Sequence, residues 1–447
     1  MFIHFIAIGG AIMHQLAIAL HHKGYKITGS DDDITDPAKS NLEKQGLLPA
    51  AFGWYPEKIA PELDAVILGM HAREDNPELQ RARELNIPVY SFPEYMYEAS
   101  REKQRIVVAG SHGKTTTTSM IMHVLRDRGM DFDYLVGAKV EGFDLSVKIS
   151  DAPVIILEGD EYPASVIEKR PKIHFYHPHV SVLTGIAWDH VNVFPTYDAY
   201  KEQFAIYLRG MTAESTLIYN AEDREVVSLV EQEGAHLRRM PYVTPTFRVQ
   251  DNAVALQTSE GKVALQIFGS HNLQNMEAAR KVCNGLGIDN QHFYRSIAGF
   301  SGAARRLEKI SEREGFVAYR DFAHAPSKLR ATLSAVRERY PDYYLIACFE
   351  LHTFSSLSEK FLGEYAHSMD KADQGAVFFS AHALQLKGLP PLDAGEVKAH
   401  FRNDRLQVFE TKEQLEPWIR QQTATAGRPV CLLLMSSGTF DGMNFTF

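Results

Sequence analysis

The sequence predicts an α/β protein of three domains with mostly parallel sheets. Short apolar runs, each long enough for one buried strand, alternate with amphipathic helical stretches near both ends of the chain, a pattern typical of parallel strands joined by helices. The length of 447 residues is too great for one ordinary core and favours about three domains of roughly 150 residues each. A Gly-Lys-Thr sequence directly after one apolar run indicates a phosphate loop in the second domain.

The first domain is expected at residues 1 to 99. Its strands are predicted in "FIHFIAI", "YKITGSD", "DAVILGM" and "IPVYSF", and "MHQLAIALHHKG" between the first two has helical spacing. Buried strands that alternate with helices at these distances predict a parallel sheet with right-handed crossovers. The charged stretch "EASREKQR" is interpreted as the linker to the next sheet.

The second domain is expected at residues 100 to 304 and the third at residues 305 to 447. Strands of the second are predicted in "IVVAG", "APVIILEGDEY" and "VSVLTGIAWDH", followed by a helix from about Tyr197. The alternation of apolar and polar residues from 243 to 267 predicts an antiparallel excursion. The strand and helix alternation resumes in "FVAYRDFAH", "YYLIACFEL", "GAVFFSA" and "PVCLLLMSSG".

Composition and charge argue against several classes of protein. The net charge is −9 and no basic block is present, so nucleic-acid binding has little electrostatic support. The three cysteines are widely spaced without a Cys-x-x-Cys pair, which favours neither disulfides nor a zinc site and suggests a reducing cytoplasm. No apolar segment reaches the ~18 residues of a membrane helix. We therefore expect a soluble cytoplasmic protein, with no nucleic-acid or membrane partner.

The stretch "IVVAGSHGKTTTTSM", residues 106 to 120, is interpreted as a phosphate loop although it departs from the standard pattern. That pattern requires a glycine where Val108 stands, and the nearer glycine is Gly110. A strand, loop and helix start in this order offer phosphate oxygens backbone N–H groups and the positive end of a helix dipole. Lys114 is expected to reach the β- and γ-phosphates and Thr115 to bind magnesium. The alternative is a helix start capped by threonines.

Acidic residues follow the next two predicted strands. Glu158, Asp160 and Glu161 end the run "IILEGDEY", and Asp189 and His190 end "GIAWDH". The carboxyl ends of parallel strands are where an α/β sheet places its site, and magnesium prefers oxygen ligands. A magnesium role is expected for at least Glu158, against the alternative of a solvated acidic turn. The histidine is a candidate ligand, although a lone histidine is more often structural.

Polar pairs also occur outside that sheet. They are Asn272 and Asn275, Arg305 and Arg306, and Asp321 and His324. The asparagines are three residues apart at a predicted helix start, so both amides lie on one face and could contact an adenine edge, unless they only cap the helix. The arginines stand beside a predicted domain junction, where a guanidinium could close over phosphates. The third pair follows a strand at the start of the third domain.

Six motifs together resemble the Mur ligase family of ATP-dependent amide-bond-forming enzymes of peptidoglycan synthesis. They are "GSHGKTTT", "EGDEY", "WDHVNVF", "GSHNLQN", "GAARRLE" and "DFAHAP". The resemblance covers essentially the whole chain, and the family's phosphate loop is the short form Gly-Thr-x-Gly-Lys-Thr, with Ser111 here at the threonine. It implies an N-terminal Rossmann-like domain for a UDP-sugar, a central P-loop ATPase and a C-terminal Rossmann-like domain that brings the amine.

The resemblance also implies functional residues, residue by residue. Catalytic roles fall to Lys114, Glu158, His190 and Arg306, and one or two Mg²⁺ ions to Thr115, Glu158 and His190. ATP is assigned to Gly110, Ser111, His112, Gly113, Lys114, Thr115, Thr116, Asn272, Asn275, Arg306 and Asp321. The UDP-sugar is assigned to Gly9, Gly10, Ser30, Asp31 and His71, although Ala7 stands where relatives often have glycine. The acceptor is assigned to His324, His352, Ser436, Ser437 and Phe440.

Within the family, the first loop is similar to the branch that uses UDP-N-acetylmuramate. Stretches such as "GSDDDITDPAKSNLEKQG" and the tail "MSSGTFDGM" are more similar to members that attach the recycled peptide L-alanyl-γ-D-glutamyl-meso-diaminopimelate than to members that add L-alanine. Thr353 and Ser356 stand where alanine-adding members usually carry arginines. The expected acceptor is therefore the peptide, with L-alanine as the alternative.

Two other classes of function remain as alternatives. A nicotinamide-dependent oxidoreductase would use "IGGAIMHQLA", but its glycine fingerprint is incomplete and it leaves the residues from Lys114 to Arg306 unexplained. A catalytically silent nucleotide-binding scaffold is opposed by the intact lysine, glutamate and histidine. The protein is expected to act as a monomer or a weak homodimer in cell-wall biogenesis, and so in cell shape and cell division.

Overall fold

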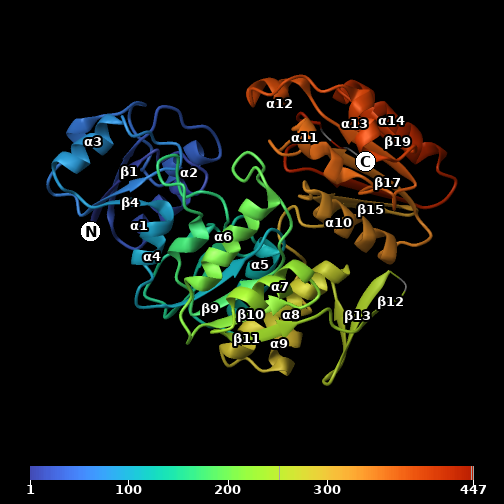
Figure 1. Cartoon of the computed structure of the whole chain (residues 1–447), viewed down its shortest axis with the longest axis horizontal. Coiled ribbons are helices and arrows are strands. Elements are labelled where there is room, and N and C mark those ends of the chain that lie inside the picture. The colour runs from blue at the N-terminus through green and yellow to red at the C-terminus, as the bar shows by residue number, and fades with distance from the viewer. Residues whose placement is uncertain (251, 444, 446–447) are drawn as a thin grey trace. The chain divides into compact units, whose positions relative to one another are not determined.

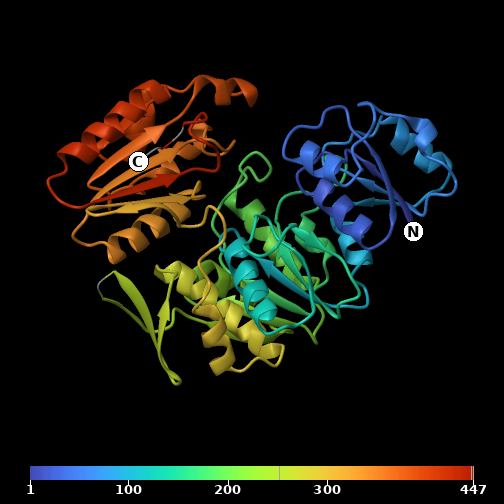
Figure 2. The same cartoon turned by 180° about the vertical axis from the view of Figure 1, so that it is seen from behind.

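The computed structural model describes every residue except 251, 444, 446 and 447. Residue 251 belongs to the predicted antiparallel segment, and the other three belong to the end of the predicted third domain. The chain divides into two compact units. Unit 1 contains Met1–Gly110, Thr117–Gly185 and Glu202–Pro241, and unit 2 contains Ser111–Thr116, Ile186–Lys201 and Tyr242–Phe447. Figures 1 and 2 show the elements from the blue N-terminal sheet to the red C-terminal strands.

Unit 1 begins with a four-stranded sheet in the order β2-β1-β3-β4, in which all neighbours are parallel. Its strands are β1 (Phe2–Ile6), β2 (Lys26–Ser30), β3 (Ala65–Leu68) and β4 (Val89–Ser91). Its helices are α1 (Met13–His22), α2 (Ala38–Lys44), α3 (Pro77–Glu84) and α4 (Phe92–Glu98), with one 3₁₀ turn at Pro56–Lys58. The prediction of a parallel first sheet is confirmed.

The predicted strand "IPVYSF" ends one residue earlier than its apolar pattern suggests. Phe92 is the first residue of helix α4, because Ser91 forms a capping box with Glu94 and Pro93 stands in the first turn. Reciprocal capping bonds satisfy N–H groups at a helix start, and proline is well suited to a first turn. Local capping chemistry therefore overrides the apolar pattern at Phe92.

Unit 1 also contains a seven-stranded sheet in the order β11-β10-β9-β5-β8-β6-β7. Its strands are β5 (Gln104–Ala109), β6 (Asp133–Leu135), β7 (Val147–Lys148), β8 (Val154–Gly159), β9 (Val180–Leu183), β10 (Thr216–Asn220) and β11 (Arg238–Tyr242). The neighbouring helices are α5 (Lys114–Asp127), α6 (Tyr197–Arg209) and α7 (Arg224–Glu233), with a 3₁₀ turn at Lys172–Phe175. β5 pairs in parallel with β8 and β9, so their carboxyl ends meet at one edge.

Unit 2 contains a six-stranded sheet in the order β15-β16-β20-β17-β18-β19. Its strands are β15 (Glu308–Arg313), β16 (Phe316–Asp321), β17 (Tyr344–Glu350), β18 (Gln374–Phe378), β19 (Leu406–Phe409) and β20 (Val430–Met435). Its helices are α10 (Pro326–Arg339), α11 (Glu359–Leu362), α12 (Ala381–Leu386), α13 (Ala394–Phe401) and α14 (Lys412–Thr425), with a 3₁₀ turn at Gly363–Tyr365. Only the pair formed by β15 and β16 is antiparallel, and every residue of β20 is buried.

The predicted antiparallel excursion forms a small sheet of three strands in unit 2. The strands are β12 (Phe247–Gln250), β13 (Ala253–Thr258) and β14 (Gly261–Leu265), and both pairings are antiparallel. Helices α8 (Ser270–Gly285) and α9 (Asn290–Ile297) follow. No helix in the described part of the chain is both long and apolar enough to cross a bilayer.

A buried polar contact fastens helix α3 to the first sheet. His4 on β1 and Glu78 on α3 are fully buried, and His4 Nε2 lies 3.2 Å from Glu78 Oε2. The other oxygen, Glu78 Oε1, accepts a 2.7 Å hydrogen bond from Tyr55 N, and His4 Nδ1 lies 2.9 Å from Thr28 Oγ1. One carboxylate thus contacts the buried His4 ring and the partly buried Tyr55 backbone, which lie in separate parts of the domain.

Glu78→Ala is expected to destabilise the first sheet by about 3 kcal/mol, because removal of one member of a buried polar pair leaves its partners unsatisfied. Native-state hydrogen exchange of the β1 and β3 amides measures this loss locally. Glu84→Ala is the matched control on the same helix, since its ion pair with Arg81 is exposed and should contribute less than about 1 kcal/mol. Equal effects of the two variants would contradict the prediction.

Candidate active site

The phosphate loop joins β5 to α5 through two glycines with positive φ. Gly110 has a φ of 128° and Gly113 a φ of 77°. A Cβ at Gly110 would lie 2.3 Å from Thr184 Oγ1, and one at Gly113 would lie 2.4 Å from Asn275 Oδ1. Both positions therefore exclude larger residues on conformational and steric grounds. Val108 lies inside β5, paired with Glu158 and Val182, so the turn begins at Gly110.

The residues around Lys114 form a tightly packed helix start. Lys114 is the first residue of α5 and is half-buried, whereas Thr115 and Thr116 are buried. Ser111 Oγ accepts a 2.8 Å hydrogen bond from Ala187 N, which fixes the loop against the segment that leads to Asp189. A helix N-terminus beneath a glycine-bounded loop is suited to an anion.

Three carboxylates lie at the carboxyl end of β8. Glu158 is on the strand, and its Oε2 accepts a 2.7 Å hydrogen bond from Gly137 N. Asp160 pairs with Lys172 at 2.7 Å, and Glu161 is fully buried. The Asp160 and Glu161 carboxylates approach within 4.8 Å. Two acidic groups this close favour a cation beside them, because like charges repel at short range.

Asp189 is held by His324, which lies just before helix α10, and by Lys328 in the first turn of that helix. It is buried, and its Oδ2 lies 3.3 Å from Lys328 Nζ and 3.4 Å from His324 Nε2. Burial alone would raise the pKa of Asp189, but Lys328, His324 and His190 hold it well below its ordinary value. The adjacent His190 has a φ of 56°, and its N–H donates to Asp189 Oδ1 at 2.8 Å. Asp189 therefore fixes the backbone that carries His190.

His324 and Lys328 form one hydrogen-bonded chain with Asp189. His324 Nδ1 lies 2.9 Å from the Phe322 carbonyl oxygen, and its Nε2 lies 3.1 Å from Lys328 Nζ. Burial and the Lys328 charge lower the pKa of His324 more than Asp189 raises it. Nδ1 donates to the Phe322 carbonyl oxygen, and Nε2 lies close to both Lys328 Nζ and the Asp189 carboxylate. The sequence placed His324 on the acceptor side, and the structure gives it this contact with Asp189.

The two asparagines of α8 have different surroundings although both are buried. Asn275 Oδ1 lies against Gly113 of the phosphate loop. Asn272 Nδ2 instead donates a 2.9 Å hydrogen bond to the Phe268 carbonyl. This contact is local but is not a helix cap, because the cap residue of α8 is Gly269 and no side chain caps the helix. The structure therefore brings Asn275, and not both amides, directly onto the loop.

Asp321 organises the turn that carries the paired arginines. Its Oδ2 accepts a 2.7 Å hydrogen bond from Leu307 N, and its Oδ1 accepts one of 2.8 Å from Ala323 N. Arg305 has a φ of 57°, and the Arg306 guanidinium lies 4.4 Å from the centre of the Phe322 ring. The buried carboxylate thus holds a strained turn beside Arg306.

The acceptor-side residues gather around a buried glutamate that the sequence analysis did not single out. Glu350 ends β17, and Ser436 Oγ and Phe440 N both donate to its Oε2, the second at 2.8 Å. His352 Nδ1 lies 3.5 Å from Glu350 Oε1. Ser437 is half-buried, and its Oγ has no hydrogen-bond partner among the described residues. Three of the predicted acceptor residues therefore share one carboxylate.

The predicted UDP-sugar residues meet at the ends of β1 and β2. Gly9 N donates a 2.7 Å hydrogen bond to Asp31 Oδ2, and burial raises the pKa of Asp31. Ser30 Oγ accepts a 3.0 Å hydrogen bond from Lys58 Nζ. Ala7 has a φ of 65°, a region costly for a residue with a Cβ. Two predicted residues stand apart from these contacts: Gly10, beside Met13, and His71, which is exposed.

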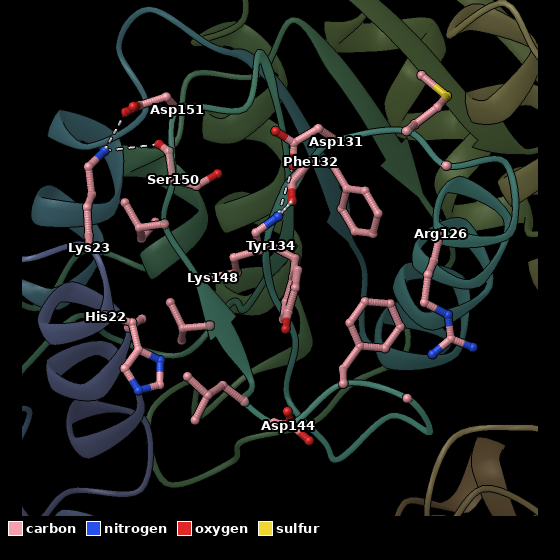
Figure 3. A pocket seen from close by; sticks show the side chains of 18 residues that line it. His22, Lys23, Arg126, Asp131, Phe132, Tyr134, Asp144, Lys148, Ser150 and Asp151 are labelled. Carbon is pink, nitrogen blue, oxygen red and sulfur yellow. Dashed lines mark hydrogen bonds and ion pairs between the residues drawn. The ribbon is translucent and has the colours of Figure 1, made fainter. Parts of the chain in front are cut away.

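A crevice of about 890 Å³ in unit 1 contains none of the predicted site residues. Figure 3 shows two of its lysines, Lys23 and Lys148, paired with neighbouring groups. Lys23 Nζ lies 3.0 Å from both Asp151 Oδ1 and the Ser150 carbonyl oxygen, and Lys148 Nζ lies 3.0 Å from Asp131 Oδ1. These pairs connect α1 and β7 with neighbouring loops, and we assign the crevice no role in the reaction.

Lys328, Glu350 and Lys58 are the residues that sequence reasoning missed. Lys328 stands four positions after His324, which is one helical turn and the only local indication of their contact. Glu350 ends an apolar strand, as Glu158 does, and that shared position was an unused indication. Lys58 stands three positions after Tyr55, and its ammonium lies 4.6 Å from the centre of the Tyr55 ring. No motif in the sequence points to Lys58.

Comparison with protein families gives three matches along the chain. The Mur ligase family catalytic domain matches residues 2–104, the Mur ligase middle domain matches residues 108–283, and the Mur ligase glutamate ligase domain matches residues 305–438. These matches follow the order of the three large sheets.

Curated relatives include enzymes with two different acceptors. The UDP-N-acetylmuramate–L-alanine ligase of Arthrobacter sp. (strain FB24) is 32% identical over 388 residues, which cover 84% of this chain and 80% of that enzyme. The UDP-N-acetylmuramate–L-alanyl-γ-D-glutamyl-meso-2,6-diaminoheptandioate ligase of Haemophilus influenzae is 26% identical over 454 residues, covering 99% and 97%.

Solved structures of both kinds of enzyme share the fold. The UDP-N-acetylmuramate-alanine ligase of Thermotoga maritima gives a TM-score of 0.70 at 21% identity, covering 99% of this chain and 97% of that one. A murein peptide ligase from Psychrobacter arcticus gives 0.64 at 22% identity with the same coverage. From its sequence matches and its three α/β domains, this chain belongs to the Mur ligase family and is an ATP-dependent acid–amino acid ligase.

Proposed function

We propose that this protein is a murein peptide ligase, which joins the carboxylate of UDP-N-acetylmuramate to the amine of L-alanyl-γ-D-glutamyl-meso-diaminopimelate in peptidoglycan recycling. The proposed domains are residues 1–99 for the UDP-sugar, 100–304 for ATP and 305–447 for the acceptor. The relative from Haemophilus influenzae, whose name contains this peptide, matches 99% of the chain.

One feature of the acceptor side carries the choice of a peptide. Thr353 Oγ1 donates to Ser356 Oγ at 3.0 Å and accepts from Ser356 N at 3.0 Å. The two positions therefore close a small polar turn on themselves and present no guanidinium to a single amino-acid carboxylate. Phe354 between them is 38% exposed, which supports a more open, partly apolar surface suited to a longer acceptor.

The second candidate is a UDP-N-acetylmuramate–L-alanine ligase of peptidoglycan synthesis. It is favoured by the relative from Arthrobacter, whose identity of 32% exceeds the 26% of the peptide ligase. The two candidates share the UDP-sugar, ATP and the chemistry of activation. They differ only in the amine, so the acceptor decides between them.

The proposed reaction begins with activation of the carboxylate. A carboxylate resists attack by an amine because its leaving group would be oxide, so an oxygen of the muramyl carboxylate first attacks the γ-phosphorus of ATP and releases ADP. The amine then attacks the carbonyl carbon of the acyl phosphate, and phosphate leaves together with one proton. Lys114 and Arg306 would stabilise negative charge as it shifts from the γ-phosphate to the leaving groups.

The donor set near β8 fits magnesium. Glu158, Asp160 and Glu161 offer carboxylate oxygens, and those of Asp160 and Glu161 lie within 4.8 Å of each other. Mg²⁺ prefers such oxygen ligands. We assign Mg²⁺ to Thr115, Glu158 and His190, with one or two ions bound. When bound, the metal supplies positive charge that neutralises the phosphates.

Lys114→Ala is expected to abolish turnover while the fold is retained. Loss of a fixed cation beside the γ-phosphate costs on the order of 3 kcal/mol or more in the transition state, which is more than about 100-fold in kcat. Phosphate release with UDP-N-acetylmuramate measures it, with Lys44→Ala, an exposed lysine on α2, as the control. An unchanged kcat would refute the ATP site.

Glu158→Ala is expected to raise the magnesium concentration needed for half-maximal activity. Glu158→Gln separates the two roles of this side chain, since glutamine can still accept the bond from Gly137 N but lacks the charge that a cation requires. Both variants should need more magnesium in a titration of phosphate release. Normal magnesium dependence in the glutamine variant would reduce Glu158 to a structural hydrogen bond.

The tripeptide L-alanyl-γ-D-glutamyl-meso-diaminopimelate is expected to support phosphate release far better than free L-alanine. A site whose polar groups pair only with the longer substrate discriminates by as much as ~10⁴ in kcat/KM. Steady-state kinetics with the tripeptide, the dipeptide L-alanyl-γ-D-glutamate and L-alanine measure this ratio. Equal or better turnover with L-alanine would make the protein an alanine-adding ligase.

A further inference from the structure

The carboxyl edge of the third sheet places the His352 imidazole beside the Glu350 carboxylate. The two oxygen atoms of this carboxylate have different partners. Glu350 Oε2 is engaged by Ser436 Oγ and Phe440 N, and Oε1 faces His352 Nδ1 at 3.5 Å. One oxygen thus anchors the loop after β20, while the other is directed at the ring. At 3.5 Å the second contact is longer than a good hydrogen bond and acts mainly through charge.

The ring of His352 is asymmetric in its surroundings. Its Nδ1 is buried without a hydrogen-bond partner among the described residues, and Glu350 supplies the nearby charge. The side chain is nevertheless 38% exposed, and none of the described residues forms a hydrogen bond with Nε2. One nitrogen therefore faces a carboxylate and the other remains accessible from solvent.

Gly438 leaves the space that lets the His352 ring lie beside the Glu350 carboxylate. A Cβ at this position would lie 2.7 Å from His352 Cγ and Nδ1 and 2.9 Å from Glu350 Oε2. Gly438 N also donates a 2.6 Å hydrogen bond to Ser436 Oγ. The close approach of ring, carboxylate and loop therefore depends on the absence of a side chain at residue 438.

The charge state of Glu350 favours a fixed tautomer of the ring. Burial would raise the pKa of Glu350, but interactions with His352, Ser436 and Phe440 outweigh burial and lower it. An ionised carboxylate beside Nδ1 stabilises the tautomer with its proton on Nδ1. The lone pair of a neutral ring is then on Nε2, the accessible nitrogen.

The position of the pair in the sheet matches that of a substrate site. Phe349, before Glu350, and Asp321, at the end of β16, both pair with Met435 of β20. The carboxyl ends of the three strands therefore coincide, and ligands of open α/β sheets bind at this edge.

We propose that His352 is the general base that takes a proton from the acceptor amine, and that Glu350 is the positioning residue that fixes its tautomer. This inference rests on the proposed ligase function but not on which acceptor is used. An amine is largely an ammonium ion at neutral pH and cannot attack in that form. An N–H proton passes to His352 Nε2, the nitrogen lone pair forms the C–N bond, and the C–O bond to phosphate breaks.

The test compares two nucleophiles on the full-length enzyme with ATP and UDP-N-acetylmuramate. One is the amine that the wild type uses best, and the other is hydroxylamine, which is largely unprotonated at neutral pH and traps acyl phosphates as hydroxamates. His352→Gln should lower kcat with the amine by about 10² to 10³-fold and leave hydroxamate formation within about twofold. His367→Gln, an exposed histidine paired with Asp370, is the matched control and should change neither rate.

Glu350→Gln tests the positioning role. Its amide can still accept the bonds from Ser436 and Phe440 at one atom but presents N–H groups to Nδ1, which favours the opposite tautomer. The same selective loss with the amine is expected, at about tenfold or more. Gly438→Ala should act in the same direction by displacing the ring.

Three results would overturn this assignment. Equal losses with amine and hydroxylamine in the His352 variant would place its role in activation or folding. A raised KM for the amine with unchanged kcat would make His352 a binding residue. A wild type that forms no hydroxamate dependent on UDP-N-acetylmuramate would refute the ligase function itself, and the base with it.

Discussion

Parallel pairing of strands is the constraint on which the candidate site depends. In a parallel sheet the carboxyl ends of adjacent strands meet at one edge, and the residues that follow them are brought together without any local sequence relation. Ala109 of β5 pairs with Gly159 of β8 and Leu183 of β9. The phosphate loop, the acidic residues after β8 and the segment that leads to Asp189 therefore begin at the same level of the sheet. The third sheet repeats this arrangement around Met435.

Three buried acids near those strand ends are each satisfied by backbone N–H groups, a hydroxyl or a cation. Asp321 accepts backbone N–H groups from residues 307 and 323, Glu350 holds the loop after β20, and Asp189 meets Lys328. An isolated buried charge is costly, so these partners offset the cost of burying the carboxyl groups. Their bonds also fix the loops that carry Arg306, Phe440 and His190, and this links stability of the fold to geometry of the site.

Much of the fold could be predicted from the sequence because buried strands leave a strong local pattern. The apolar runs before Gly110, Glu158 and Asp321 are strands in the structure, and the alternating segment after residue 243 is antiparallel. The short strands β6, β7, β10, β11, β15 and β19 were not predicted, since they carry few consecutive apolar residues. The opposite error occurs at Phe92, which was predicted in a strand but is the first residue of helix α4 because of the capping box.

The candidate site was less predictable because its contacts join distant segments. Lys328 and Glu350 carry only weak local indications in the sequence, and the fold is needed to show that one meets Asp189 and the other meets Ser436. The split between Asn272 and Asn275 likewise depends on Phe268 and Gly113, not on their spacing. The family resemblance assigned a role to the two asparagines, but the contacts that each of them makes follow from tertiary packing.

The contact between Gly113 and Asn275 has a consequence for how the protein matures during synthesis. The phosphate loop is made early, but the side chain against which it packs belongs to α8 and leaves the ribosome much later. Local segments can form before such distant contacts, which close slowly because the intervening chain must first be ordered. A nascent chain that ends before α8 therefore has the loop sequence without the side chain that lies beside Gly113 in the finished protein.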